Sequence, residues 1–198
     1  MSTEFCRGPT IYFRETSPSD LVAFTEALSD WETFPLSTER VKTYMLGLFT
    51  SYRAIIRPYT NENSFRELVT ICRVSDNEPI GLNQWTLLPN KHIEVNHIAI
   101  RPDYRGQGYR NEAVIIRDAI FYDVFQINSV KTMIDSPYLS PKDYQTVTET
   151  ATSNRNGRVR KSLHSTLESW NTWKANNSTS IPSYTYSGND YVAPHLRD

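Results

Sequence analysis

Hydrophobic positions in the first part of the chain change from an alternating pattern to a helical one. Thr10–Glu15 alternates apolar with polar residues, which predicts a short strand. The next segment, from Ser17 to Asp20, is typical of a helix start, because serine can cap a helix and proline suits its first position. Apolar residues spaced by three and four then predict a helix over Pro18–Ser29 and a second helix capped by Ser37.

The middle of the chain returns to short apolar runs separated by turns. Three strands and a long amphipathic helix are expected there, followed by one more strand. Their predicted ranges are Leu68–Val74, Pro79–Leu87 and His92–Arg101 for the strands, Gly108–Phe125 for the helix, and Ser129–Asp135 for the last strand. The complete order of strand, two helices, three strands, helix and strand predicts a mixed α/β (α+β) sheet domain.

The last third of the chain has a different composition. Ser140–Gly157 is polar, and the spacing of Leu163, Leu167 and Trp170 predicts a helix over Arg160–Asn176. The proline- and tyrosine-containing end is expected to be irregular. We therefore expect a core over residues 1–138 and a divergent extension over residues 139–198 that packs on it.

Composition narrows the class of protein. The chain has 198 residues with a formal net charge of -1, 38% hydrophobic and 22% charged residues, which fits a folded domain with no global attraction to nucleic acid or membrane. It lacks both a signal-peptide pattern and the run of about 20 apolar residues that a membrane helix needs. Cys6 and Cys72 match no zinc or redox spacing. We expect a soluble, cytoplasmic protein in which Cys72, inside an apolar run, is a buried thiol.

The strand over His92–Arg101 contains a break in its alternation. Ile93 and Val95 have one parity, whereas Ile98 and Ile100 have the other. A regular strand keeps its parity, so the switch predicts a β-bulge near Asn96-His97. A strand buried on both faces, where alternation need not hold, is the alternative.

A pair of glycines follows at a strand-to-helix junction. Gly106 and Gly108 can adopt positive φ and let a ligand approach the backbone closely. The unpaired N–H groups of the first helical turn favour an anion such as a pyrophosphate. Neither G-x-G-x-x-G nor the Gly-Lys-Ser/Thr of a P-loop is present, which argues against Rossmann and P-loop sites.

These residues resemble the core motif of the GNAT superfamily of acyl-CoA-dependent N-acyltransferases. The family pattern is Gln/Arg-x-x-Gly-x-Gly/Ala, and Asp103–Gly108 supplies both glycines with aspartate in the first place. A register that starts at Arg105 instead keeps the arginine and Gly108 but puts Arg110 in the last place, where a small residue is common. The resemblance extends over about Thr10–Pro137 and is closest to the branch of ribosomal-protein and other N-terminal acetyltransferases, whereas the family's usual ending is not recognisable after Asp135.

The resemblance implies a GNAT-like, mostly antiparallel sheet flanked by helices, and acetyl-CoA as cosubstrate. It also implies transfer of an acetyl group to a primary amine, which could belong to a protein N-terminus, a lysine or a small amine. The residues then expected to bind the cosubstrate are Ile98, Ala99, Ile100, Arg105, Gly106, Gln107, Gly108, Tyr109, Arg110 and Asn111.

The resemblance also suggests catalytic groups. Glu94 stands six residues before Ile100, the place of the glutamate general base in histone-type members, and His97 is the second candidate. Tyr144, or else Tyr138, is the candidate proton donor to the departing thiolate. Backbone N–H groups of Ile98 or Ala99 are expected to polarise the thioester carbonyl. No metal site is expected, and the side chains expected on the acceptor side are those of Asn83, Trp85 and Ser136.

A second class of function stays open at this point. The basic cluster Arg155–Lys161 and the tyrosine-containing tail could bind a macromolecule, nucleic acid included, on a GNAT scaffold with little or no acetylation activity. Turnover with a panel of amines would distinguish an enzyme from such a binding protein.

Overall fold

One sheet organises the protein. The computed structural model describes residues 4–20, 25, 65–134, 141–152, 159–179 and 181–186. Within them nine strands form a single sheet in the order β7-β8-β6-β5-β4-β3-β2-β1-β9. The strands are β1 (Glu4–Arg7), β2 (Ile11–Glu15), β3 (Phe65–Arg73), β4 (Pro79–Leu88), β5 (His92–Ile100), β6 (Ser129–Ile134), β7 (Thr146–Thr152), β8 (Val159–Thr166) and β9 (Thr185–Tyr186).

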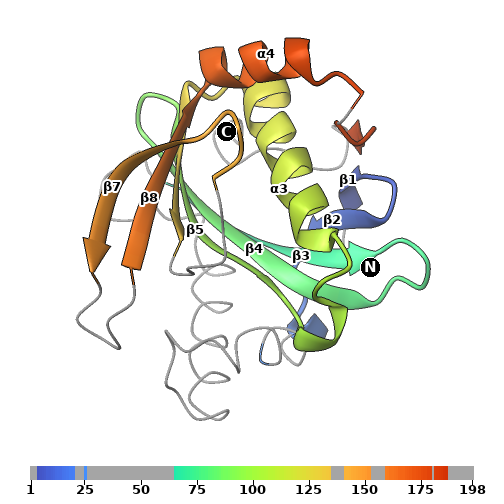
Figure 1. Cartoon of the computed structure of the whole chain (residues 1–198). Helices are drawn as coiled ribbons and strands as arrows, with labels where there is room; N and C mark the ends of the chain where they lie inside the picture. Colours follow the sequence, from blue (N-terminus) through green and yellow to red (C-terminus); the bar gives the residue numbers. More distant parts are fainter. Residues whose placement is uncertain are drawn as a thin grey trace.

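The sheet is mixed and mostly antiparallel, as predicted. Among the described strands β5 and β6 are the parallel neighbours, and the helix between them is α3 (Tyr109–Ala119), which ends in a π-helical turn over Ile120–Val124. Helix α4 (Leu167–Asn176) follows β8, and short 3-10 turns lie at Pro18–Asp20 and Pro102–Tyr104. Figure 1 shows α3 lying across one face of the sheet and α4 at the end of β8.

Apolar side chains of α3 and of the sheet face below it form the core. Trp85 on β4 is 3% exposed and packs edge-on against Phe121, with ring centroids 5.1 Å apart. Trp170 of α4 is fully buried and stacks on Tyr122 at 5.8 Å. Both cysteines are free and buried, which confirms the expectation for Cys72. No helix in the described part of the chain is long and apolar enough to cross a membrane.

The expected helix over Arg160–Asn176 is wrong in its first half. Val159–Thr166 is strand β8, which pairs with both β6 and β7. Leu163 and Leu167 fit a helical spacing, but Leu163 lies in β8 with its side chain in the core. The helix begins only after Thr166, whose side chain accepts a hydrogen bond from the backbone N–H of Ser169 at 3.1 Å in a capping box.

Strand β7 lies in the segment that composition marked only as polar. Its threonines suit a strand, and Val147 is 45% exposed, so this edge strand lacks the apolar face that would have revealed it. Because β8 pairs with β6, residues beyond 139 continue the same sheet as the core. The division of the chain at residue 138 into a core and an extension stays a prediction.

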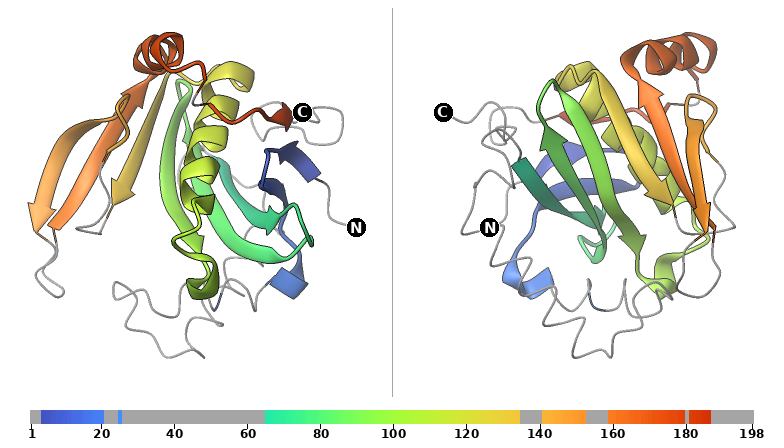
Figure 2. Two further views of the ribbon diagram at one scale, coloured as in Figure 1. Left: turned by 45° about the vertical axis from the view of Figure 1, so that its right-hand side comes forward. Right: turned by 90° about the vertical axis from the view of Figure 1, so that its left-hand side faces the viewer.

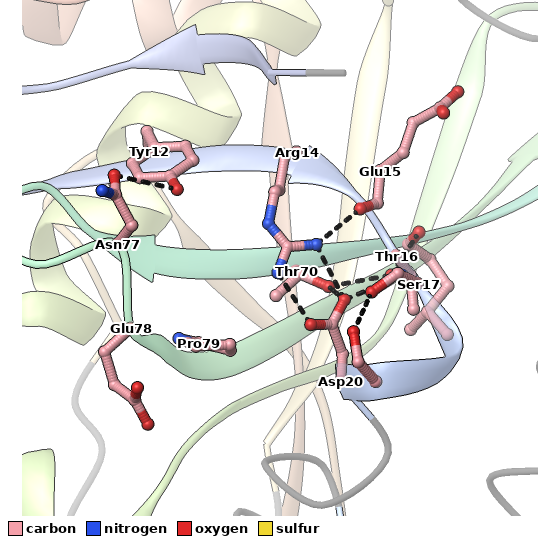
Figure 3. Close-up of polar contacts among 12 residues, drawn as sticks. Tyr12, Arg14, Glu15, Thr16, Ser17, Asp20, Thr70, Asn77, Glu78 and Pro79 are labelled. Carbon is pink, nitrogen blue, oxygen red and sulfur yellow. Dashed lines mark hydrogen bonds and ion pairs between the residues drawn. The ribbon is translucent and has the colours of Figure 1, made fainter. Parts of the chain in front are cut away.

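A buried carboxylate fixes the start of the first predicted helix. Asp20 is 1% exposed and accepts hydrogen bonds from both Nη atoms of Arg14 at 2.7 and 2.8 Å. It also accepts from the backbone N–H of Ser17 and the hydroxyl of Thr70, each at 2.8 Å (Figure 3). The rest of the helix over Pro18–Ser29, apart from helical Thr25, lies outside the described residues, as does the whole helix expected after Ser37.

Candidate functional site

Strands β5 and β6 run together and then separate. Their pairing extends from His92 opposite Ser129 to Val95 opposite Thr132. On the other side of β5, Trp85 pairs with Val95 but Gln84 pairs with His97, which leaves Asn96 as an extra residue. The predicted bulge is therefore confirmed. Beyond it, β6 continues along β8 while β5 turns away (Figure 2, left).

The end of β5 directs backbone groups into this split. The N–H of Arg101 donates to the carbonyl of Ile80 on β4 at 2.8 Å. Because backbone groups of successive strand residues point in opposite directions, those of Ile98 and Ile100 point away from β4, toward the split. The carbonyl of Ile100 there accepts from Nε of Arg105 at 2.8 Å. By the same alternation, the groups of Ala99 are used for pairing with β4.

The glycine loop after β5 has the predicted conformation. Gly106 and Gly108 have φ of 74° and 86°, and a Cβ atom at either position would meet nothing within 4 Å. Gly108 is the N-cap of α3 and provides no side-chain cap. The N–H groups of Tyr109, Arg110 and Asn111 in the first turn therefore have no partner within the helix. Gln107 is exposed, and its side chain donates to the carbonyl of Asp103 at 3.2 Å.

Arg110, Arg117 and Lys142 form a cationic cluster where α3 meets the segment before β7. Nζ of Lys142 donates to Oδ1 of Asn111 at 3.0 Å. Arg110 is partly buried, and burial together with the nearby charge of Arg117 lowers the pKa of Arg110 to about 10. Burial, followed by the charge of Arg110, also lowers the pKa of Lys142. A cation in the first turn of a helix is disfavoured by the helix dipole, so Arg110 is suited to an anionic ligand.

The inner end of this cluster is a buried ion pair. Nε of Arg117 donates to Oδ1 of Asp118 at 2.7 Å, and both residues are at most 1% exposed. The hydroxyl of Tyr144 donates to Oδ2 of Asp118 at 2.6 Å, and burial raises the pKa of Tyr144 well above its usual value. Tyr144 was expected to follow a helix start at Ser140-Pro141, but it lies within a turn that is not helical and is 3% exposed.

The other catalytic candidates lie on or beyond β5. Glu94 is partly exposed, pairs with Thr86 on β4 and lies beside Lys131 on β6. His97 occupies the bulge, where its backbone pairs with Gln84. Tyr138 and Ser136 lie outside the described residues, as do Arg155 and Arg158 of the basic cluster. No group of three or more histidine, cysteine, aspartate or glutamate side chains that could hold a metal occurs in the described ranges.

His92 and Ser129 form a further polar pair at the start of β5, the end of the strand that lies away from the glycine loop. Nδ1 of His92 is 2.6 Å from the hydroxyl of Ser129, and its ring stacks on that of His164 with centroids 6.3 Å apart. Burial lowers the pKa of His92, which keeps the ring neutral near pH 7. His92 shares a strand face with Glu94, two residues further along.

Sequence reasoning missed Arg117, Asp118 and Lys142. Arg117 and Asp118 are adjacent charges within an otherwise apolar helix run, and a helix of this length between two strands is expected to be buried along one side. Two charged residues within an apolar, buried helix face were the signal that could have revealed this pair. Lys142 had no comparable signal, because its contact with Asn111 joins residues 31 positions apart.

Comparisons with known proteins agree with this fold. The model of the "Acetyltransferase (GNAT) family" matches residues 21–114. No curated protein matches the sequence. Among solved structures, a GNAT-family acetyltransferase from Bacillus anthracis has a TM-score of 0.61 at 12% identity, covering 83% of this chain and 99% of its own.

Two other similar structures have acceptors in their names. The ribosomal-protein α-N-acetyltransferase RimL has a TM-score of 0.62 at 12% identity, with coverage of 84% and 95% of the two chains. A chimera of the Vibrio cholerae spermidine N-acetyltransferase SpeG and hSSAT has a TM-score of 0.61 at 10% identity, with coverage of 82% and 98%. At such identities the likeness concerns the fold, and it confirms the predicted GNAT architecture.

Proposed function

Because this chain has the GNAT acetyltransferase fold and matches that family, we propose that it transfers an acetyl group from acetyl-CoA to a primary amine. The observation that carries the proposal is the split between β5 and β6, into which Ile98 and Ile100 direct backbone groups beside the open glycine loop. An extended arm with amide groups can pair with such a strand end, and a pyrophosphate fits the helix start next to it.

The proposed binding mode uses the predicted residues. The pyrophosphate lies over Arg105–Asn111, held by first-turn N–H groups and by the charge of Arg110. The pantetheine arm follows the free edge of β5, with Ile98 and Ile100 as its backbone partners in place of Ala99. The acetyl carbonyl then accepts a hydrogen bond from the N–H of Ile98, which stabilises the negative charge that develops on that oxygen.

The chemistry requires one base and a route for two protons. Glu94 removes one proton from the ammonium group of the acceptor. The amine nitrogen bonds to the carbonyl carbon, the carbon–sulfur bond breaks, and the second amine proton ends on the departing sulfur. Tyr144 remains the candidate donor for this last proton, although its hydroxyl is engaged with Asp118. Tyr138 and His97 are the further candidates.

The acceptor belongs to the class of primary amines. RimL and SpeG carry a ribosomal protein and spermidine in their names, which supports either a protein N-terminus or a small polyamine as acceptor. A cytoplasmic setting is part of the proposal, and the free, buried thiols of Cys6 and Cys72 support it.

Binding of the cosubstrate can be tested at Gly108. A tryptophan there would project into the space assigned to the pyrophosphate, so we expect Gly108→Trp to abolish acetyl-CoA binding in calorimetry while the protein stays folded. Asn90→Trp is the matched control, because Asn90 is exposed, has a positive φ of 65° and lies in the β4–β5 turn at the opposite end of β5. Undiminished affinity in Gly108→Trp would rule out this placement.

Catalysis can be tested at Glu94. Glu94→Gln keeps the size of the side chain but removes the base, so kcat should fall by about 10²–10⁴-fold near neutral pH while the affinity for acetyl-CoA is unchanged. The deficit should shrink as the pH rises, because more of the amine arrives without its extra proton. A deficit that is the same at every pH would assign Glu94 a structural role instead.

A further inference from the structure

Glu94 belongs to a row of paired residues on the sheet face that points away from α3. Its neighbour Val95 pairs with Trp85, which packs on Phe121 at the end of α3, so Val95 faces the helix and Glu94 faces the other way. Paired residues share a face of the sheet. The row through Glu94 is completed by Thr86 on β4, Lys131 on β6, His164 on β8 and Thr146 on β7.

This row is closed on one side of Glu94 and open on the other. Thr86, the partner of Glu94 on β4, is only 4% exposed. Lys131 and His164 are partly exposed, and Met133, two residues beyond Lys131 on the same face, is 45% exposed. An acceptor whose amine lies at Glu94 therefore extends over β6 and β8. That stretch is about 10 Å wide, because neighbouring strands are about 4.8 Å apart.

Lys131 places an unpaired cation beside Glu94. The two residues are direct partners on β5 and β6, yet Lys131 forms no ion pair or side-chain hydrogen bond with any residue in the described ranges. Its charge acts on this face of the sheet. Burial lowers the pKa of His92, the negative charge of Glu94 opposes this shift, and the charges of His164 and Lys131 add to it. The base and the cation therefore act on the same small region.

A cation next to the base discriminates among amines. An α-amino group has a pKa of about 7.7–8.0 and a lysine side chain one of about 10.4, so an α-amine arrives neutral far more often near pH 7.5. A polyamine would bring further ammonium groups over the open part of the row, where Lys131 repels them. An anionic group close to the amine of the acceptor would be attracted instead.

We propose that the acceptor is the α-amine of a polypeptide whose second residue is acidic. The inference rests on the proposed function, which places the amine at Glu94. The second residue lies about 3.8 Å along the chain from the first, so its carboxylate can reach the ammonium group of Lys131 one strand spacing away. The following residues then extend over Met133 and His164. A free amino acid would also offer a carboxylate, but it would leave this exposed stretch uncovered.

Matched peptides test the inference on the full chain with acetyl-CoA as cosubstrate. Three hexapeptides begin with serine, differ only in a glutamate, glutamine or arginine at the second position, and contain no lysine. Mass spectrometry follows their acetylation. We expect kcat/KM for the glutamate peptide to exceed that for the glutamine peptide by about fivefold, and the arginine peptide to be the poorest of the three. Spermidine and free glutamate complete the panel of acceptors.

The outcomes separate this inference from the proposed function. Equal kcat/KM for the glutamate and glutamine peptides, or spermidine as the best acceptor, would overturn the inference and leave amine acetylation in place. Free glutamate as the best acceptor would assign Lys131 to a small amino acid and overturn the polypeptide acceptor. Absence of product from every amine would remove the proposed function and this inference with it.

Variants of Lys131 assign the preference to its charge. Lys131→Met keeps the apolar stem of the side chain and should bring the ratio of kcat/KM for the glutamate and glutamine peptides to about one. Lys131→Glu should make the arginine peptide the best of the three, and Lys131→Arg should retain the original order. Lys91→Glu is the control, because it makes the same charge change at an exposed position in the β4–β5 turn. An unchanged ratio in folded Lys131→Met would refute the assignment.

Discussion

Two buried carboxylates, Asp20 and Asp118, hold arginines in different surroundings. Asp20 is saturated by Arg14, Ser17 and Thr70, each through a hydrogen bond in the normal range (Figure 3). Burial alone would raise the pKa of Asp20, but these hydrogen bonds outweigh it and lower the pKa below its usual value. Asp118, in contrast, accepts hydrogen bonds from Nε of Arg117 and from the hydroxyl of Tyr144, and Nη1 of Arg117 has no hydrogen-bond partner among the described residues.

Replacement of Asp20 should reveal its pH-dependent contribution to stability. We expect Asp20→Asn to lower the free energy of unfolding at pH 7 by about 3 kcal/mol, because Arg14 is left buried without its counter-charge. The folded-state pKa lies below the unfolded one, so this stabilisation is complete above about pH 4 and is lost as the pH falls through the folded-state pKa. Urea unfolding of both proteins at pH 7 and pH 3 measures the change.

The surface pair Arg73–Asp76 provides the control for Asp20. Asp76→Asn should have little effect at either pH, because exposed ion pairs contribute little to stability. A difference between the original protein and Asp20→Asn that stays the same at both pH values would contradict the assigned role of the carboxylate charge.

The boundary between β8 and α4 depends on a single capping box. Thr166 and Ser169 bond to each other's backbone, which ends the strand and satisfies two donors at the start of the helix. We expect Thr166→Ala to lower the free energy of unfolding by about 1 kcal/mol, whereas Thr172→Ala at an exposed position within the same helix should not destabilise the protein. Thermal unfolding compares the two, and equal losses would mean that the cap is unimportant.

At the scale of the whole molecule, the two ends of the described chain meet the same core. Leu163 of β8 and Trp170 of α4 are at most 1% exposed. Tyr186 of β9 packs edge-on against Phe125 at 6.2 Å, and β9 pairs with β1. The last third therefore supplies interior residues to the domain, although its composition resembles that of a surface extension.

Truncation tests this dependence. A chain ending at residue 138 would expose the β6 edge that β8 covers and the core surface beneath Trp170. We expect it to be unfolded or aggregated, because a loss of this kind exceeds the usual net stability of a domain. Circular dichroism and size-exclusion chromatography would show the result. A monomeric truncated protein with a cooperative unfolding transition would instead support the predicted boundary at residue 138.

The sequence was informative where the signal is local. The central strands, the bulge near His97, the positive φ of Gly106 and Gly108, and helix α3 were all predicted, because alternation, parity and glycine act over a few neighbouring residues. Strand β7 and the first half of the helix expected after Arg160 were not predicted correctly. Strand pairing and burial decide such segments, and both depend on distant partners.

The sequence by itself determined the order of the central elements, the loop at Gly106–Gly108 and the resemblance to GNAT acyltransferases. Only the tertiary structure decided how far β5 and β6 pair, and only it buried the Arg117–Asp118 pair against Tyr144. The physical reason is that backbone conformation is set by neighbours along the chain. The pairing of a buried polar atom depends instead on which residues of other elements come within hydrogen-bond distance, and no local pattern encodes that.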